Sequence, residues 1–324
     1  MSEDHKMTSD KPDLLLIHTS APMVLPGLEE RFVVHRPPEG SDPGDGRDAF
    51  VAGIADRIRA LMVSTFFGAD ADLINALPNL EIVINGGGHY DSTDVEAVRA
   101  RGLPMTYTPQ LTTEDVADHV ISLLLHVARR MCEGDRFVRA GNWLHGPMGF
   151  GTQVHGKRFG IVGLGHIGRA VGRRAEAFDL DVCYNGPRRK DDVSYRYYAD
   201  LAEMAAAVDF MAVTCCTAPD TRHIVDGRVL QALGGEGLLV NVARQTIDQT
   251  ALIAALEDGT VAGAGLDVFE SEPDLPDVLL AMENVVLTPH MASSAIEAKQ
   301  DQRDMILANL DAHFAGQPLP TPIP

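Results

Sequence analysis

The first hundred residues alternate between short apolar runs and amphipathic segments. Five runs have the length and composition of buried strands: residues 14–18, 32–35, 60–64, 81–85 and 104–106. Gly, Pro, Asn or Asp bounds each run, as is typical of strands. Amphipathic segments such as residues 70–76 and 93–100 lie between them. This alternation predicts a parallel sheet covered by helices.

The pattern changes after Pro109. Thr112 and Thr113, followed by Glu114 and Asp115, predict the capped and acidic start of a long helix over residues 116–131. Six further strand candidates then alternate with helical segments, at residues 158–162, 181–184, 210–214, 238–242, 262–267 and 285–287. Such a series predicts a doubly wound, dinucleotide-binding domain. The last helix, at residues 295–314, belongs to neither series, and the Pro-rich residues 318–324 predict an extended tail.

A glycine-rich segment follows the strand at residues 159–162 and opens a helix at residues 169–178. In this context G-x-G-x-x-G is the dinucleotide fingerprint: the first Gly allows a tight turn, the second admits the pyrophosphate and the third packs helix against strand. The helix N-terminus then attracts the phosphates. The alternative is a tight turn without a ligand. We expect six residues to contact the cofactor: Gly163, Leu164, Gly165, His166, Ile167 and Gly168.

The residues after the second strand of this series bear on the choice of cofactor. NAD sites place an acid about twenty residues beyond the fingerprint. Here Asn185 stands in that region, and Arg188, Arg189 and Lys190 follow. A guanidinium pairs with a 2′-phosphate that a carboxylate would repel. We therefore expect NADPH in preference to NADH; the alternative is a run of solvated surface charges.

Composition narrows the classes of partner. The chain of 324 residues is 45% hydrophobic and 23% charged, with a net charge of −19. A surface of this charge repels nucleic acid and anionic membranes, so neither is expected to bind. A small anionic substrate is also repelled at long range, so its site needs locally concentrated cations or backbone N–H groups.

Cysteine usage and the start of the chain bear on compartment. The four cysteines, Cys132, Cys183, Cys215 and Cys216, form no C-x-x-C pair. Residues 1–11 are polar and lack the apolar core of a signal peptide. Apolar stretches such as residues 120–128 are too short to span a bilayer. We expect a reduced, cytoplasmic protein without a structural metal.

Three short segments at strand ends carry candidate chemistry. Asn241-Val242-Ala243-Arg244 ends one strand, residues 266–273 follow another, and Leu287-Thr288-Pro289-His290 follows a third. Ligands of open α/β sheets bind at the carboxyl ends of the strands, so these segments are expected to converge. Arg244 alone could be a surface ion-pair residue and His290 alone a loop histidine, but their joint occurrence favours an active site.

Together these segments resemble the D-isomer-specific 2-hydroxyacid dehydrogenase family over nearly the whole chain. Trp143, Thr221 within residues 217–221, and the Gly263-to-Val268 segment add to the resemblance. It implies that Arg244, Glu272 and His290 carry catalysis. It also implies cofactor contacts from four further residues: Cys215, Thr221, Val242 and Asp267. Asp267 either contacts the nicotinamide amide or caps the turn after its strand.

The chemistry suits these residue types. Hydride reduction of a ketone leaves an alkoxide that needs a proton, and His is the usual acid near neutral pH. Glu272 would favour the protonated ring of His290. Arg244 would hold the substrate carboxylate and polarise the carbonyl. Glu270 is a nearby acidic competitor, but Glu272 precedes Pro273, as the family pattern requires.

The loop after the strand at residues 81–85 resembles the family's substrate loop, whose backbone N–H groups hold the carboxylate. Gly87, Gly88 and His89 are therefore expected to bind substrate. The family usually has Gly at the positions of His89 and Gln245, so the loop geometry and the substrate size remain open here. His89 either contacts the substrate or is a solvent-exposed turn residue.

The fold expected is α/β, with two doubly wound parallel-sheet domains and a cleft between them. Residues 1–108 and 292–324 would form a flavodoxin-like substrate-binding domain, and residues 109–291 an inserted NAD(P)-binding Rossmann domain. The resemblance also implies a homodimer.

The function expected is NADPH-dependent reduction of a small 2-keto acid to the D-2-hydroxy acid. Glyoxylate and hydroxypyruvate come first as substrates and 2-ketogluconate next, because the cationic segment at residues 185–190 and the stretch at residues 195–198 resemble the reductases of that branch. The alternatives are a hydroxyphenylpyruvate-type reductase and a dinucleotide-sensing, corepressor-like binding protein. The motifs leave the physiological keto acid and the strictness of the NADP preference open.

Overall fold

The computed structural model describes residues 11–19, 22–38, 45–65 and 67–324. The chain divides into two compact units, Met1–Thr112 with Ala295–Pro324 (unit 1) and Thr113–Ser294 (unit 2). Apart from Lys11, the polar start on which the signal-peptide expectation rested lies outside the described residues.

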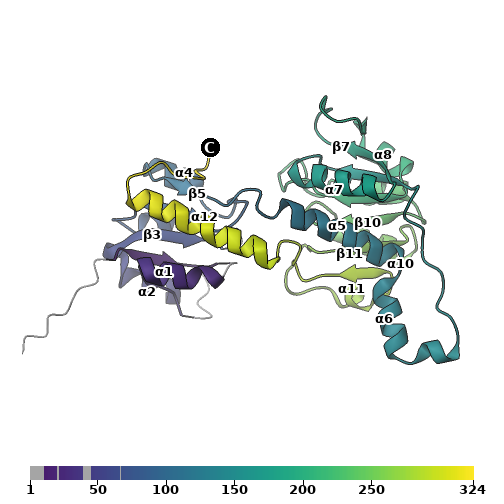
Figure 1. Ribbon diagram of the computed structural model, residues 1–324, viewed down its shortest axis with the longest axis horizontal. Coiled ribbons are helices and arrows are strands. Elements are labelled where there is room, and N and C mark those ends of the chain that lie inside the picture. The colour runs from purple at the N-terminus through teal and green to yellow at the C-terminus, as the bar shows by residue number, and fades with distance from the viewer. Residues whose placement is uncertain (1–10, 20–21, 39–44, 66) are drawn as a thin grey trace, which may run out of the picture. The chain divides into compact units, whose positions relative to one another are not determined.

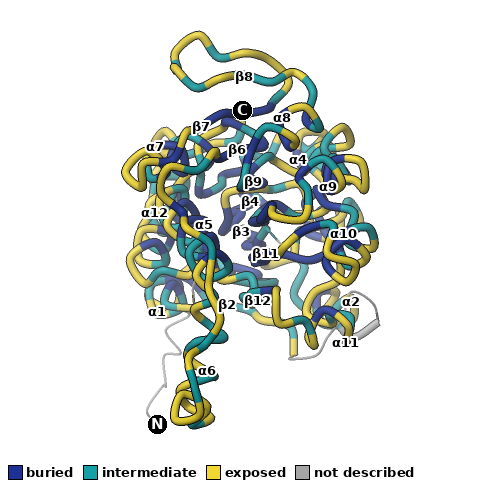
Figure 2. Tube along the Cα trace, turned by 90° about the vertical axis from the view of Figure 1, so that its right-hand side faces the viewer, coloured by how far each residue is buried: buried dark blue, intermediate teal, exposed yellow. Residues whose placement is uncertain are grey.

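Unit 1 is built on a parallel five-stranded sheet with the order β2-β1-β3-β4-β5. Its strands are β1 (Asp13–Leu16), β2 (Val33–His35), β3 (Ile58–Val63), β4 (Ile82–Asn85) and β5 (Met105–Thr106). Strands β1, β3, β4 and β5 are mostly buried, and β3 and β4 are dark blue in Figure 2, which explains their apolar runs; the edge strand β2 is only partly buried. This order is the doubly wound one of flavodoxin-like domains, as the sequence predicted.

Helices cover both faces of the unit 1 sheet. Residues of α1 (Leu25–Arg31) and α12 (Ile296–Phe314) pack on one face, and those of α2 (Asp45–Ala52), α3 (Ala71–Asn75) and α4 (Val95–Ala100) on the other. Figure 1 shows α12, in yellow, running along this sheet. Short 3-10 turns lie at η1 (Pro22–Val24) and η2 (Ala55–Arg57). The predicted last helix thus completes unit 1.

The Pro-rich end is extended, as predicted, but it is not a free tail. Pro322 forms an antiparallel bridge with Thr106, and the Ile323 N–H donates to the Met105 carbonyl at 2.9 Å. The Ile323 side chain packs on the core of unit 1. The last residues therefore cover the edge of β5, because an exposed strand edge leaves backbone groups unpaired.

Unit 2 contains a parallel seven-stranded sheet with the order β12-β11-β10-β9-β6-β7-β8. Its strands are β6 (Arg158–Val162), β7 (Asp181–Asn185), β8 (Arg196–Tyr198), β9 (Phe210–Val213), β10 (Leu238–Asn241), β11 (Gly263–Leu266) and β12 (Val285–Leu287). The two parallel-sheet domains confirm the predicted fold class. The sequence predicted six strands and missed β8, a three-residue edge strand with no fully buried residue.

Two layers of helices enclose the unit 2 sheet. Residues of α5 (Thr113–Ala128) and α7 (His166–Ala177) pack on one face, and those of α8 (Leu201–Ala207), α9 (Gly227–Leu233), α10 (Gln249–Glu257) and α11 (Asp277–Ala281) on the other. Helix α6 (Met131–Arg139) and η3 (Asn142–His145) extend away from the body of unit 2 (Figure 1). Within the described ranges, no helix is both long enough and apolar enough to cross a membrane.

The long helix predicted for residues 116–131 ends earlier than expected, at Ala128. Arg130 adopts a left-handed conformation with a φ of 53°, which interrupts the helix before α6 begins at Met131. Its guanidinium pairs with Glu133 at 2.7 and 2.6 Å and donates to the Phe150 carbonyl at 3.2 Å. These contacts offset the conformational cost of the break.

Candidate active site

The turn between β6 and α7 has the geometry that the fingerprint requires. Gly163 has a φ of +92°, and a side chain there would lie 2.5 Å from Cys215 Cα. A side chain on Gly168 would lie 2.2 Å from the Gly163 carbonyl. Gly165, in contrast, faces open space, because a Cβ at this position would meet no atom within 4 Å. The two outer glycines are thus fixed by packing, and the middle one leaves room for a ligand.

Helix α7 differs from α8, α9 and α10 at its N-terminus. The side chains of Asp200, Asp226 and Asp248 cap α8, α9 and α10, each by accepting a backbone N–H. Helix α7 starts after Gly165 and has no side-chain cap. The partial positive charge of this N-terminus therefore lies beside the open space at Gly165, an arrangement that suits a phosphate. The residues fit the pyrophosphate of a dinucleotide.

The end of β7 presents no carboxylate. Asn185 is 5% exposed and turns its amide toward β8, donating to the carbonyls of Tyr198 and Ala199 at 2.9 and 3.3 Å. Arg188 and Arg189 are exposed. No acidic partner for either is found among the described residues, whereas Arg169 nearby pairs with Asp192 at 3.0 Å. Two cations are thus available at the end of the second strand of unit 2.

The other residues expected to contact the cofactor lie after β9 and β10. Cys215 lies against the turn at Gly163, and burial raises the pKa of its thiol to about 12, so the thiol stays neutral. Thr221 Oγ1 donates to the Cys216 carbonyl at 2.7 Å and accepts from the Ala218 N–H at 2.8 Å. The Thr221 hydroxyl therefore stabilises the turn at residues 216–221, in which it lies. Val242 packs partly against the core.

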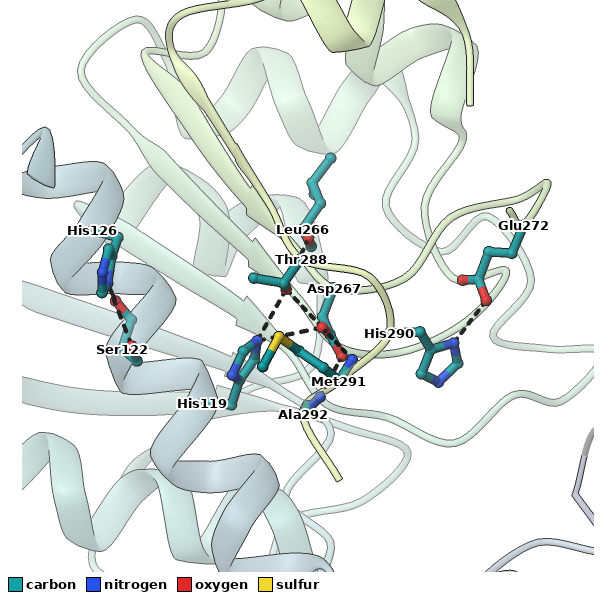
Figure 3. A network of polar contacts seen from close by, with 10 residues as sticks. All are labelled: His119, Ser122, His126, Leu266, Asp267, Glu272, Thr288, His290, Met291 and Ala292. Atoms are coloured by element: carbon teal, nitrogen blue, oxygen red, sulfur yellow. Dashed lines mark hydrogen bonds and ion pairs between the residues drawn. The ribbon is translucent and has the colours of Figure 1, made fainter. Parts of the chain in front are cut away.

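His290 and Glu272 form a pair. The Nδ1–H of His290 donates to Glu272 Oε2 at 2.7 Å, which leaves Nε2 as the other ring nitrogen. Both side chains are about a quarter exposed, at 27% and 26%. Figure 3 shows the two side chains directed toward each other from loops that follow different strands. A carboxylate that orients a partly exposed imidazole is the arrangement of a general acid and its positioning group.

The environment of Glu272 keeps it ionised. Burial opposes ionisation, but hydrogen bonds from His290 and from the Phe269 N–H, together with the positive charges of His290 and Arg244, hold the pKa of Glu272 below its ordinary value. The Phe269 N–H lies 2.8 Å from Glu272 Oε1. Arg244, from the end of β10, is thus close enough to act on Glu272 electrostatically.

Nearby contacts hold the backbone of Arg244. Thr217 Oγ1 donates to the Arg244 carbonyl at 2.9 Å, and the next residue, Gln245, takes a left-handed φ of 59°. That conformation explains why glycine is usual at this position in the family.

The two candidate acids have different partners. Glu270 pairs with His223 at 2.5 Å, so Glu272 is the acid that contacts His290.

Asp267, at the end of β11, is 1% exposed and holds the loop that follows β12. Its Oδ1 accepts from Thr288 Oγ1 at 2.6 Å and from the Met291 N–H at 2.9 Å, and its Oδ2 accepts from the Ala292 N–H at 3.0 Å. His119 Nε2, from α5, lies 3.3 Å from Oδ1 (Figure 3). These bonds join the loop after β12 and not the turn after β11, so the contact with the nicotinamide amide stays a prediction.

In unit 1 the loop after β4 directs its carbonyls inward. The amide of Asn85 donates to the carbonyls of Gly87 and His89 at 3.0 and 2.8 Å. The N–H groups of Gly88 and His89 have no acceptor within the described part of the chain, and both residues are exposed. Free, adjacent N–H groups are suited to an anion. The His89 side chain lies at the surface.

Sequence reasoning did not identify the side chains that support these groups. His119 lies on α5 among the buried residues Val116, Ala117 and Val120, and a polar residue in such a stripe is the signal that could have drawn attention to it. The role of the Asn85 amide depends on how its loop folds back, which no local pattern encodes. Across the described residues, no group of three His, Cys, Asp or Glu side chains is arranged to hold a metal ion.

Comparisons with known proteins agree with this geometry. Residues 121–292 match the model of the D-isomer specific 2-hydroxyacid dehydrogenase, NAD binding domain. The chain is 44% identical to a hydroxyphenylpyruvate reductase of Plectranthus scutellarioides, covering 91% of this chain and 94% of the other. It is 34% identical to a 2-ketogluconate reductase of Gluconobacter oxydans, covering 97% and 99%.

A solved structure is also similar over nearly the whole chain. It is an NADPH-dependent glyoxylate/hydroxypyruvate reductase from Sinorhizobium meliloti, in complex with NADP and malonate. The TM-score is 0.88 and the identity 37%, with 97% of each chain covered. This solved structure shares the fold, and the family resemblance inferred from the motifs is confirmed. The chain belongs to the D-isomer-specific 2-hydroxyacid dehydrogenase family and is an NAD(P)-dependent reductase of 2-keto acids.

Proposed function

We propose that this protein reduces a small 2-keto acid to the D-2-hydroxy acid with NADPH, and that glyoxylate and hydroxypyruvate are its main substrates. The observation that carries the catalytic part is the hydrogen-bonded pair of His290 and Glu272 beside Arg244. Unit 2 would bind the cofactor, and unit 1 would contribute to binding the substrate.

The preference for NADPH rests on charge at the end of β7. Asn185 stands in place of an acid and is engaged with β8, so no carboxylate there would repel a 2′-phosphate. Arg188 and Arg189 supply exposed guanidinium groups that suit such a phosphate. Neither arginine has an acidic partner in the described structure, so both charges are available to a phosphate although the chain has a net charge of −19. The Sinorhizobium relative, described as NADPH-dependent, supports the same preference.

Three residues of unit 2 would carry the reaction. The bound nicotinamide dinucleotide supplies the hydride for the keto carbon. His290 Nε2 donates a proton to the developing alkoxide oxygen, while Glu272 orients the ring through Nδ1. Arg244 holds the substrate carboxylate and polarises the carbonyl. One keto acid, one NADPH and one proton thus give one hydroxy acid and one NADP⁺.

The loop after β4 would give the carboxylate a second set of donors. Gly88 and His89 present N–H groups that no described residue accepts, while Asn85 fixes the carbonyls of the loop away from them. Gly87 is buried, and a side chain there would collide with Thr65 Oγ1, so its role is to let the loop pack closely. The exposed His89 side chain leaves room for contact with the tail of a substrate.

The proposed substrates follow from the relatives, because the side-chain pocket is not defined by motifs. The Sinorhizobium enzyme is named for glyoxylate and hydroxypyruvate. A 2-ketogluconate reductase and a hydroxyphenylpyruvate reductase are also similar over most of the chain, which makes their substrates the runners-up.

A homodimer is proposed from the arm formed by α6 and η3 in unit 2. The arm and its flanks carry large apolar side chains with high exposure: Met131, Val138, Trp143, Leu144 and Phe150. Exposed apolar patches of this kind mark protein–protein contacts. The proposed partner is a second copy of the chain, because the family resemblance implies a homodimer.

A reducing, cytoplasmic location is proposed from the cysteines. All four are free thiols in the structure, and thiols persist where glutathione and thioredoxin keep them reduced.

The substrate proposal is tested by steady-state kinetics with NADPH and four keto acids: glyoxylate, hydroxypyruvate, 2-ketogluconate and hydroxyphenylpyruvate. We expect the highest kcat/KM with glyoxylate or hydroxypyruvate. A preference of tenfold or more for either of the other two would replace the proposed substrate and leave the reaction class intact.

A further inference from the structure

The loop that carries His290 has an unusual backbone. His290 has a φ of 50°, in the left-handed region that non-glycine residues avoid, and its N–H donates to the Thr288 carbonyl at 2.9 Å. Such a conformation persists only when its surroundings fix it. The direction of the His290 side chain therefore depends on what holds residues 288–292.

Asp267 holds this loop immediately after His290. Its two oxygens accept the N–H groups of Met291 and Ala292, at 2.9 and 3.0 Å. Burial opposes the charge of Asp267, but the hydrogen bonds that it accepts from His119, Thr288, Met291 and Ala292 keep its pKa below the ordinary value. An ionised, nearly inaccessible carboxylate accepts strongly, so it is an effective clamp.

His119 connects this clamp to α5. A carboxylate only accepts, and Thr288 Oγ1 donates to Asp267 at 2.6 Å, so the His119 Nε2–H is the donor both to Thr288 Oγ1 at 3.0 Å and to Asp267 Oδ1 at 3.3 Å. Figure 3 shows His119 reaching from α5 to the loops that follow β11 and β12. Helix α5 itself packs against the sheet through buried apolar residues, so it is a rigid support.

We propose that His119 is a positioning residue for the reaction: through Thr288 and Asp267 it fixes the left-handed loop that directs His290 toward Glu272. The side chain would not touch the substrate. This inference rests on the proposed role of His290 as the proton donor.

The test compares two substitutions at one position. His119→Gln keeps an amide N–H near the place of Nε2, whereas His119→Leu keeps the bulk and removes the donor. We expect the Leu variant to lose about tenfold or more in kcat for keto acid reduction, since a small misplacement of a catalytic group costs that much. Its KM for NADPH should change less than twofold, and the Gln variant should stay within threefold of the unmodified protein in kcat.

A second readout does not depend on turnover. Amide hydrogen exchange of the peptide that contains Met291 and Ala292 should become faster in His119→Leu and stay unchanged in His119→Gln. His126→Leu is the matched control: His126 lies on the same helix but bonds only within it, to Ser122, and should change neither readout. If His119→Leu does not fold, Thr288→Val removes the same link and takes its place.

The outcomes separate the two proposals. An unmodified protein without keto acid turnover defeats the proposed function, and the exchange data still decide whether His119 holds the loop. A folded His119→Leu variant with normal kcat and normal exchange, in an active protein, overturns the inference alone. Equal losses in the Leu and Gln variants overturn it as well, because they would show that the donor is not the cause.

Discussion

At the residue scale, the chemistry of this site depends on a few charged groups with well-defined partners. The ring of His290 has its Nδ1 committed to Glu272, and Glu272 has one oxygen for the ring and the other for the Phe269 N–H. Arg244 adds a positive charge that helps Glu272 stay ionised. The three groups therefore have different roles, and single substitutions should separate these roles.

Replacing Arg244 tests the binding of the substrate carboxylate. We expect Arg244→Ala to lower kcat/KM for the keto acid by about a thousandfold, because a preorganised cation at a developing charge contributes that much. Arg244→Lys should recover part of the loss, since it keeps the charge but not the bidentate geometry. Steady-state kinetics with hydroxypyruvate would measure this. Near-normal kcat/KM in the Ala variant would refute the assigned role.

Replacing Glu272 tests how the proton donor is oriented. The pKa of Glu272 is lowered, so Glu272 stays charged throughout the neutral range, and its bond to the ring of His290 weakens only when the pH falls into the acid range and the carboxylate is protonated. Glu272→Gln has no carboxylate to protonate, so the fall in kcat/KM that the protonation of Glu272 causes in acid should be absent from this variant. Its kcat at neutral pH should be lower by about tenfold or more, because the ring loses its charged partner. A pH–rate profile identical to that of the unmodified protein would contradict this account.

At the scale of elements, the sequence predicted most of what positions the site. The five strands of unit 1, the long strands of unit 2 and the fingerprint turn followed from apolar runs and glycine spacing, and the strand-end segments lie where parallel topology requires. Two features were missed for physical reasons. Strand β8 is a short edge element with little burial, and the end of α5 depends on the pairing of Arg130 with Glu133.

The contacts of individual side chains were less predictable. The sequence showed that Asn185 stands where an acid was expected. It did not show where the amide of Asn185 points, because this amide donates to the carbonyls of Tyr198 and Ala199 at the end of β8, and β8 was not predicted. The same holds for Asp267 and His119, which meet only through the packing of α5 against β11 and β12. Local patterns locate elements, whereas contacts between elements distant in sequence decide what each side chain does.

The end of β7 gives a prediction about cofactor choice. The double substitution Arg188→Ala and Arg189→Ala should raise the KM for NADPH about tenfold or more, since each hydrogen bond to a charged group is worth about 1.5–3 kcal/mol. The KM for NADH should change less than twofold. Parallel kinetics with the two cofactors measure the difference. Removing Arg36 and Arg99, two exposed arginines of unit 1, controls for the change in net charge; equal losses for both cofactors would point to a stability effect.

At the scale of the whole molecule, the chain joins a flavodoxin-like unit made of two segments to an inserted dinucleotide-binding unit. Its net charge of −19 disfavours polyanionic partners in general. We therefore propose that binding of a dinucleotide and a keto acid depends on local features, namely the uncapped α7, the two arginines after β7 and the loop N–H groups of unit 1. These features are confined to a few turns and loops.

The arm of unit 2 gives a prediction about assembly. Light scattering coupled to size-exclusion chromatography should give the mass of two chains for the unmodified protein. Trp143→Glu with Leu144→Asp should give the mass of one, because charges would replace the most exposed apolar side chains of the arm. Leu280→Asp, at an exposed apolar position on α11, is the control and should remain dimeric. A monomeric unmodified protein would refute the proposed homodimer.

The central claim is that the site built from Arg244, Glu272 and His290 transfers a hydride from NADPH to a 2-keto acid. The most direct test incubates the protein with NADPH and hydroxypyruvate and measures both the NADPH consumed and the chirality of the glycerate formed. We predict one D-glycerate for each NADPH oxidised. Tight NADPH binding without consumption, with hydroxypyruvate or any of the other three keto acids, would contradict the account and favour a dinucleotide-sensing protein instead.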